Sequence, residues 1–237
     1  MSRVDSTDIL GNIQRAFDTL NHKLEKDVKD HLRQVYSTLT FALLVSMVGA
    51  IVNYVFDFYS FRFLFTIAIF GLMIGLIATP ATHGNEKTRL IYLYSFAFLT
   101  GCNLAPFIQA LDAEPALIFN AYMITCIVFG CFSLAALYAD STKFLHLGGI
   151  LGSALLCLLI TALFARSAFM FGVIMWGGLA INCGFVLYDT QLICEKRRRG
   201  DTDYIWHTVE LFIDFVNIFR YILILLKDKD NNKRRRD

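Results

Sequence analysis

Charged side chains are scarce in this sequence. Only 18% of its 237 residues are Asp, Glu, Lys or Arg, whereas 56% are hydrophobic; an average soluble domain is about one quarter charged. The 22 basic and 20 acidic residues nearly cancel, leaving a net charge of +2. They separate apolar runs and do not gather into a basic face. These proportions argue against a water-soluble protein and against nucleic-acid binding.

Signatures of secreted and metal-binding proteins are also missing. The six cysteines form no C-x-x-C pair, and the five histidines are not clustered, so we expect neither a zinc site nor any other cofactor. The first 33 residues are polar and lack an early apolar core with a small-residue cleavage site. We therefore expect no cleaved signal peptide.

Long stretches without any Asp, Glu, Lys or Arg are what the sequence has in abundance. Six of them, each 22 to 25 residues long, occupy residues 34–56, 63–85, 90–111, 115–139, 144–165 and 167–188. About 20 apolar residues suffice to cross a bilayer as a helix. The sequence therefore predicts an all-α, polytopic membrane helix bundle with six transmembrane helices.

A seventh apolar stretch, 204–226, carries Glu210, Asp214 and Arg220. Such charges are costly in lipid, so this helix is either central and sheltered by the other six, or re-entrant. We divide the chain into an amphipathic cytosolic segment (1–33), the bundle (34–226) and a basic cytosolic tail (227–237). Gly71 with Gly75, and Gly148 with Gly152, have the spacing that allows close helix approach.

The basic residues predict the orientation. With six spans, 13 Lys and Arg fall on the amino-terminal side and two on the other, so the amino terminus is expected in the cytosol. Six more basic residues follow residue 226, and the same rule slightly favours a re-entrant last helix. We expect the end of the tail to contact anionic lipids or acidic partners, through Lys233, Arg234, Arg235 and Arg236.

The seventh stretch has a polar stripe. Five side chains recur three and four residues apart and so share one helix face: His207, Glu210, Asp214, Asn217 and Tyr221. In a bilayer such a face should line the bundle interior or a water-filled cavity. The alternative is a helix lying flat on the membrane surface, but those helices usually present Lys and Arg, and this stripe is acidic.

A second aspartate matches the depth of Asp214. The sixth span is expected to continue as a helix through the basic cluster 197–199 and to end at Gly200, with Asp201 and Thr202 offering the next helix cap. Asp189 lies about eleven residues before this turn and Asp214 about twelve after it, so antiparallel helices would bring both to a similar depth. The alternative is that Asp189 is a solvated residue at the end of a span.

Three segments resemble a known family. They are FAFLTG (96–101), GFVLYDTQLI (184–193) and DYIWHTVELFIDFVNIFR (203–220), and they are similar to the corresponding segments of the Bax inhibitor motif-containing membrane proteins. The resemblance implies six helices around a seventh, residence in the endoplasmic reticulum membrane, a pH-sensitive calcium leak and suppression of cell death. It maps the family's paired aspartates onto Asp189 and Asp214. The arginine that bacterial relatives carry inside the second span is absent here.

Physical chemistry suggests how such a pair could work. Two carboxylates in a poorly hydrated cavity cannot easily both ionise, so they would share a proton and form a pH-controlled two-state element. Calcium prefers oxygen ligands. We expect weak, transient calcium contacts at Asp189 and Asp214, and an ion pathway along Glu210, Asn217 and His207. Calcium ions, protons, membrane lipids and apoptosis-regulating membrane proteins are the expected partners.

Two other classes of function remain open. An intramembrane aspartyl protease also places aspartates on consecutive spans, and Tyr188-Asp189 resembles its first motif. However, Phe212 and Ile213 precede Asp214 where that class has a G-x-G sequence, and no P-A-L element follows Asp214, because all three prolines lie far upstream. We therefore expect no enzyme. The other class is a non-conducting scaffold that binds apoptosis regulators or channels.

Overall fold

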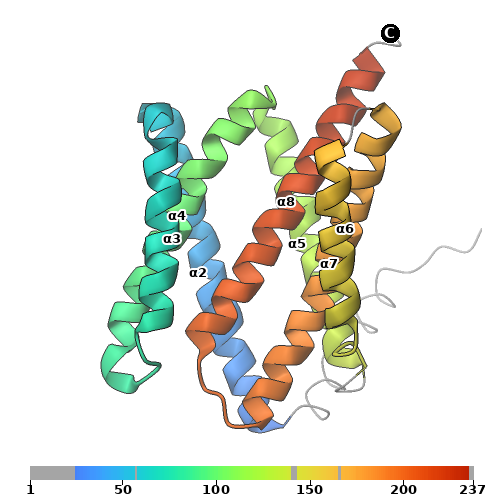
Figure 1. Ribbon diagram of the computed structural model, residues 1–237. Helices are drawn as coiled ribbons and strands as arrows, with labels where there is room; N and C mark the ends of the chain where they lie inside the picture. Colours follow the sequence, from blue (N-terminus) through green and yellow to red (C-terminus); the bar gives the residue numbers. More distant parts are fainter. Residues whose placement is uncertain (1–24, 57, 140–142, 165–166, 235–237) are drawn as a thin grey trace, which may run out of the picture.

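The bundle is entirely helical in the part of the chain that can be described. The computed structural model describes residues 25–56, 58–139, 143–164 and 167–234, in which no strand occurs (Figure 1). The long helices are α2 (Lys26–Phe56), α3 (Arg62–Ala78), α4 (Glu86–Ala110), α5 (Pro115–Tyr138), α6 (Leu147–Phe164), α7 (Ala168–Arg198) and α8 (Tyr204–Arg234), with short 3₁₀ turns η1 (Phe58–Phe61) and η2 (His83–Asn85).

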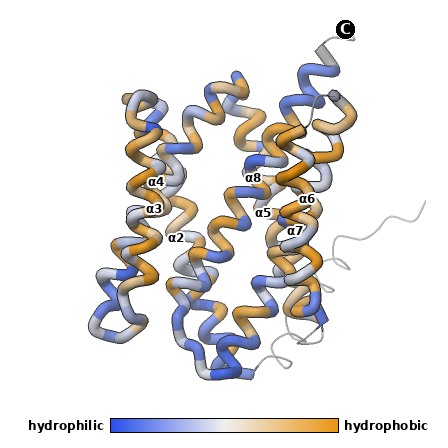
Figure 2. Tube along the Cα trace, in the orientation of Figure 1, coloured by the Kyte–Doolittle hydropathy of each residue, from blue (hydrophilic) through white to orange (hydrophobic). Residues whose placement is uncertain are grey.

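The outside of the bundle is apolar. Large hydrophobic side chains on the outer helices are well over half exposed, including Phe70 and Ile74 on α3 and Leu156 and Leu163 on α6. Figure 2 shows hydrophilic residues mainly at the two ends of the bundle and along α8. An apolar surface around a partly polar interior is suited to lipid and not to water. The expected polytopic membrane bundle is confirmed.

Five of the six predicted spans are long and apolar enough to cross a membrane, namely the helices at residues 26–56, 83–110, 115–138, 147–164 and 169–198. The predicted span 63–85 is shorter, because α3 ends at Ala78. Thr79 is extended, with φ −90° and ψ 114°, as expected for the residue before a proline. Pro80 therefore stops α3 after 17 residues, or about 26 Å.

Helix α8 runs through the whole bundle. Its 31 residues span about 46 Å, and it packs against α2, α4, α5 and α7, whereas α3 packs mainly on α4 and α6 on α7 (Figure 1). Near its far end the Lys227 ammonium donates to the Asp112 carbonyl in the α4–α5 connection. Of the two arrangements that the sequence left open, the structure therefore shows a central helix and not a re-entrant one.

Because α8 runs the length of the bundle, the described chain begins and ends at opposite ends of the bundle. The start of α2 lies near the α7–α8 turn, where Glu25 and Arg198 are 3.9 Å apart, and α8 ends at the opposite end of the bundle. If the bundle stands upright in a membrane, a cytosolic amino terminus and a cytosolic tail cannot both hold. Most of the predicted amphipathic segment (residues 1–24) lies outside the described residues, as do the side chains of residues 233–236; their lipid contacts stay a prediction.

Close helix approach occurs at one of the four expected glycines and at two others. A Cβ at Gly101 on α4 would overlap the Ser46 carbonyl oxygen of α2, and one at Gly49 would overlap the Phe98 carbonyl oxygen. Of the expected glycines, Gly148 on α6 would overlap the Tyr188 ring of α7, whereas Gly71 and Gly152 would meet nothing within 4 Å and Gly75 meets the Tyr92 ring at 3.5 Å. The contact between α2 and α4 therefore depends on two glycines that have no i, i+4 partner glycine.

We expect Gly101→Ala to destabilise the bundle by about 1–3 kcal/mol, because the two backbones must separate to admit a methyl group. Gly71→Ala is the matched control and should be neutral or slightly stabilising, since alanine favours a helix. Thermal unfolding of the purified protein in detergent measures both. Equal midpoints for the two variants would contradict the close approach of α2 and α4.

Candidate functional site

The two aspartates meet between α7 and α8. These helices are antiparallel neighbours joined by the short turn 199–203, and they bring the Asp189 and Asp214 carboxyl groups close enough to interact electrostatically, while Asp214 Oδ2 is buried without a hydrogen-bond partner. Asp214 is only 6% exposed. The structure thus places this pair as the matched depths predicted; its role in pH sensing and its transient calcium contacts stay predictions.

The turn between these helices forms almost as the sequence indicates. Helix α7 ends at Arg198, and Gly200 has φ 97°, the left-handed conformation that glycine adopts without strain. The cap of α8 is one residue later than expected. The Asp203 carboxylate accepts from the Trp206 backbone N–H at 3.1 Å, while Asp201 accepts from the Asp203 N–H at 2.8 Å.

A third carboxylate lies one helical turn before Asp214. The Glu210 Oε1 atom accepts from the Lys196 ammonium and from the Trp206 indole N–H, both at 2.9 Å. Its other oxygen is buried without a hydrogen-bond partner. Lys196 therefore neutralises Glu210 and is not directed at the aspartate pair. Within the described ranges, no cluster of three His, Cys, Asp or Glu could hold a metal ion.

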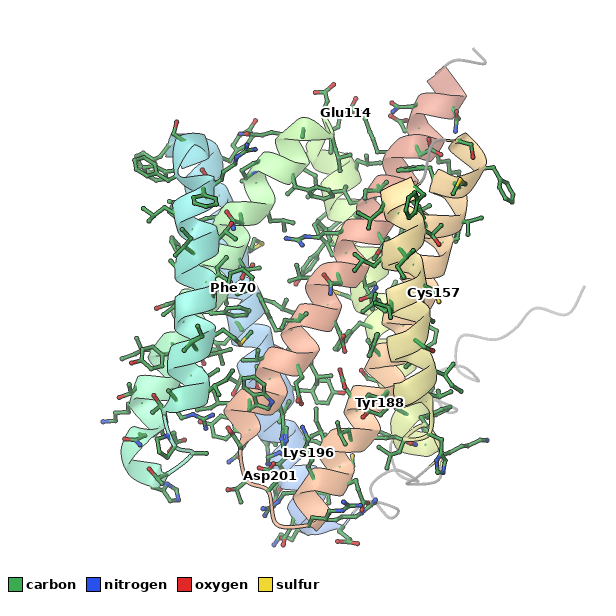
Figure 3. All side chains as sticks on the ribbon, viewed as in Figure 1. Phe70, Glu114, Cys157, Tyr188, Lys196 and Asp201 are labelled. Atoms are coloured by element: carbon green, nitrogen blue, oxygen red, sulfur yellow. The ribbon has the colours of Figure 1, made fainter. Side chains whose placement is uncertain are left out.

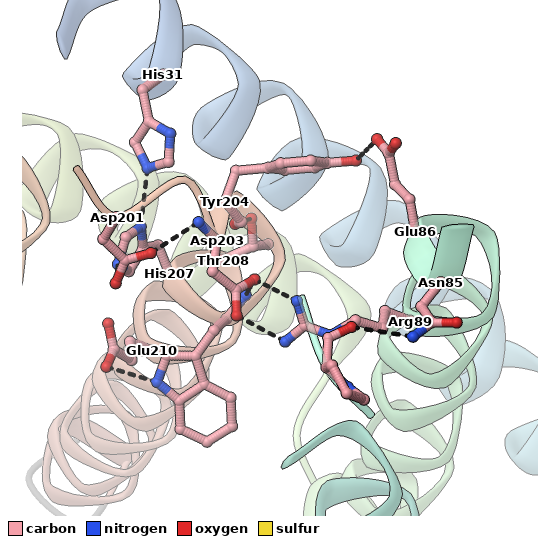
Figure 4. Close-up of polar contacts among 12 residues, drawn as sticks. His31, Asn85, Glu86, Arg89, Asp201, Asp203, Tyr204, His207, Thr208 and Glu210 are labelled. Atoms are coloured by element: carbon pink, nitrogen blue, oxygen red, sulfur yellow. Dashed lines mark hydrogen bonds and ion pairs between the residues drawn. The ribbon is translucent and has the colours of Figure 1, made fainter. Parts of the chain in front are cut away.

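His207 contacts α2 and not the aspartates. It is fully buried, and its Nδ1 lies 2.8 Å from Nε2 of His31, with the two rings at 80° (Figure 4). Its Nε2 lies 3.7 Å from the Asp201 carboxylate. The rest of the stripe continues along α8: Asn217 is half-buried, and a Cβ at Gly178 of α7 would overlap the Tyr221 ring. His207 is thus at the end of the stripe, against a different helix.

The ion pair of Arg89 with Asp203 lies at the same end of the bundle and could not be predicted from the sequence. Both Arg89 nitrogens of the guanidinium fork donate to Asp203 at 2.7 Å, and the Tyr204 hydroxyl donates to Glu86 at 2.7 Å (Figure 4). Arg89 is 4% exposed. These contacts fix the start of α4 to the start of α8. In Figure 3 the labels of Lys196 and Asp201 mark this end, and Glu114 marks the opposite one.

Asp203 lies outside the spanning helices, and its carboxyl group is ionised at neutral pH. Burial alone would raise the pKa of Asp203, but the hydrogen bonds from Arg89 and from the Trp206 backbone outweigh it and lower the pKa below its usual value. A carboxylate of this kind stabilises the fold above the ordinary aspartate range and loses that contribution only as pH falls through its lowered pKa. Asp203 is therefore not a sensor of neutral pH.

Comparisons with known proteins identify the family. Residues 28–231 match the family described as "Inhibitor of apoptosis-promoting Bax1". The chain is 42% identical to Bax inhibitor 1 of Bos taurus over 212 residues, which cover 88% of this chain and 90% of the relative. Bax inhibitor 1 of Homo sapiens is 42% identical over 87% of this chain and 89% of its own length. Bax inhibitor 1 of Arabidopsis thaliana is 36% identical, with 92% and 90% covered.

These matches are long enough to show membership. The chain belongs to the Bax inhibitor 1 family and is an apoptosis-inhibiting membrane protein with several membrane-spanning helices.

We expect Arg89→Gln to destabilise the protein by about 1.5–3 kcal/mol, because it leaves the half-buried Asp203 without its charged hydrogen-bond partner. Arg199→Gln is the control: Arg199 is exposed and pairs with Glu195 along the same helix, which is worth about 0.3–0.5 kcal/mol. Thermal unfolding in detergent between pH 5 and 8 should show a constant gap between Arg89→Gln and the parent. A gap that closes as pH falls from 8 to 6 would contradict the lowered pKa of Asp203.

Proposed function

We propose that this member of the Bax inhibitor 1 family is a pH-sensitive calcium leak of the endoplasmic reticulum membrane that suppresses cell death, and that Asp189 and Asp214 gate it. The observation that carries the proposal is the proximity of these two carboxyl groups on neighbouring helices inside an apolar bundle. Acidic groups inside a membrane protein usually belong to an ion or proton pathway.

Repulsion between the two aspartates supplies the gate. Two negative charges in contact, away from water, repel strongly, so the pair holds one proton between its carboxyl groups. Losing that proton adds repulsion between α7 and α8 and biases them apart. The Arg89–Asp203 ion pair and the Lys196–Glu210 pair hold the turn end of both helices. Separation would therefore be greatest away from that turn.

The ion path follows the polar stripe of α8. Oxygen atoms of Asp189, Asp214, Glu210 and Asn217 are the hard ligands that calcium prefers. Calcium is the cargo here, and a leak requires contacts weak enough for the ion to leave again. His207 is assigned to the turn end of this path, where it contacts His31. A non-conducting scaffold for apoptosis regulators is the alternative function.

Calcium flux into liposomes tests the gate. The parent should show an inflection of flux near neutral pH that flattens or shifts in Asp189→Asn and in Asp214→Asn, since each removes a like-charge term of roughly 1–3 kcal/mol. Because the carboxyl groups act as a unit, the double variant should be little worse than either single one. Glu210→Gln should change conductance more than pH dependence. Asp30→Asn, at an exposed site on α2, is the control.

The possible outcomes separate the candidate functions. Additive effects of the two aspartate variants would rule out a shared proton. Unchanged flux in every variant would remove this stripe from the ion path. Absence of flux in the parent would favour the scaffold, and cleavage of a membrane substrate would favour an aspartyl protease.

Epitope tags at both termini test the orientation. We expect an amino-terminal tag to be reached by antibody once the plasma membrane is permeabilised, because 13 basic residues lie on that side against two. A carboxy-terminal tag should need permeabilisation of the organelle membrane as well, because α8 runs from one end of the bundle to the other. A luminal amino terminus would overturn the orientation, and a carboxy-terminal tag reached from the cytosol would show that α8 does not cross.

A further inference from the structure

Arg220 on α8 is a half-buried cation that has no counter-charge among the described residues. Its Nε atom is inaccessible and has no hydrogen-bond partner, and the guanidinium makes no ion pair or hydrogen bond within the part of the chain that the structure describes. An unpaired guanidinium inside a membrane bundle is unfavourable, and such residues usually mark a binding site. Water could supply hydrogen bonds to this guanidinium, but only a bound anion could supply an ion pair.

The Arg220 side chain lines a cavity of about 470 Å³ between α3, α4 and α8. Arg62 and Thr66 of α3 lie at its exposed side, and Asn103 of α4 lies deeper. The Asn103 amide donates to the Thr66 hydroxyl at 3.0 Å, and this hydroxyl donates to the Arg62 carbonyl at 2.9 Å. Among the described residues that line the cavity there is no carboxylate. Its polar side chains therefore present mainly donors and positive charge.

The cavity lies toward the end of the bundle that holds the α4–α5 connection. Arg220 precedes Lys227 by seven residues, and Lys227 binds the α4–α5 connection, so Arg220 is about 10 Å below that connection. Arg62 begins α3, and Phe61 at its N-cap makes no side-chain hydrogen bond to the helix. The positive end of the α3 dipole thus adds to the two arginines. Phe61 is half-exposed, and Phe63, which lines the cavity, is largely exposed, so the opening has an apolar rim.

We propose that this cavity binds a phosphate-class anion, with Arg220 as its principal ligand. The guanidinium fork matches two phosphate oxygens, and a cavity of this size is far larger than a halide ion and comparable to small-ligand sites. The depth and the apolar rim favour the headgroup of an anionic phospholipid, and free phosphate shares the same chemistry. This site is on the opposite half of α8 from the aspartate pair and does not depend on a calcium leak.

Lipid retention tests the site directly. The purified full-length chain is incubated in neutral detergent with phosphatidic acid or with phosphatidylcholine, and bound lipid is counted by native mass spectrometry. Phosphatidic acid should be retained about tenfold less by Arg220→Met than by the parent, since a charged hydrogen-bonded contact is lost. Lys229→Met removes one exposed charge near the same end of α8 and should retain the lipid like the parent. Equal retention by the parent and Arg220→Met overturns the proposal.

A second arm separates the two sources of phosphate. If inorganic phosphate alone raises the unfolding midpoint of the parent as much as phosphatidic acid does, but not that of Arg220→Met, the ligand is the free ion. If only the lipid acts, the ligand is a headgroup.

A third measurement needs no variant and covers the case in which Arg220→Met does not fold. Phosphatidic acid or inorganic phosphate should slow the reaction of Arg220 with phenylglyoxal, followed by peptide mass spectrometry, relative to the exposed Arg33 at the other end of the bundle. Equal slowing at both arginines overturns the proposal.

Discussion

Hydrocarbon cannot solvate the charged and polar groups of α8, and the arrangement of the bundle follows from this constraint. His207, Glu210, Asp214 and Arg220 all lie on one helix, and an ion in lipid costs several kilocalories per mole unless it is sheltered. The described structure therefore surrounds α8 with α2, α4, α5 and α7 and leaves the apolar α3 and α6 to face lipid. Helix order in the bundle is set by the most polar helix, not by the most apolar ones.

Each polar group on α8 meets a different neighbour, and this fixes the rotation of the helix. His207 contacts α2, Glu210 contacts α7 through Lys196, and Lys227 reaches the α4–α5 connection. A rotation of α8 by one residue would break all three contacts at once. Hydrophobic packing alone would allow several rotations, because apolar side chains flank the stripe on both sides. The polar contacts thus select one arrangement of a helix that is otherwise free to turn.

Features that depend on local sequence could be predicted, and those that depend on distant partners could not. The charge-free runs located the helices, Gly200 marked the end of α7, and residue counts placed Asp189 opposite Asp214. In contrast, Arg89 was only one more basic residue at the start of a span, and nothing near it points to Asp203, 114 residues away. Of the predicted glycines only Gly148 lies at a close helix contact, and Gly101 was missed because its close approach depends on Ser46 of another helix. The sequence could not decide between a central and a re-entrant α8, because the positive-inside rule favours the re-entrant helix and burial of the acidic stripe favours the central one.

The cations near Asp189 and Asp214 bear on what can compensate their charge. Within the described residues neither aspartate makes an ion pair, and Lys196 of α7, whose charge also acts on Asp189, binds Glu210. Helix α3 carries only Arg62, at its first residue, and this side chain lines the cavity with Arg220, which lies six residues, or about 9 Å, beyond Asp214 along α8. Under the proposed mechanism a proton is then the charge that relieves repulsion between the aspartates, whereas a fixed cation already serves Glu210. Raising the pH would remove that proton and leave the ion pair of Lys196 with Glu210 in place, so that pH would act on the aspartate pair.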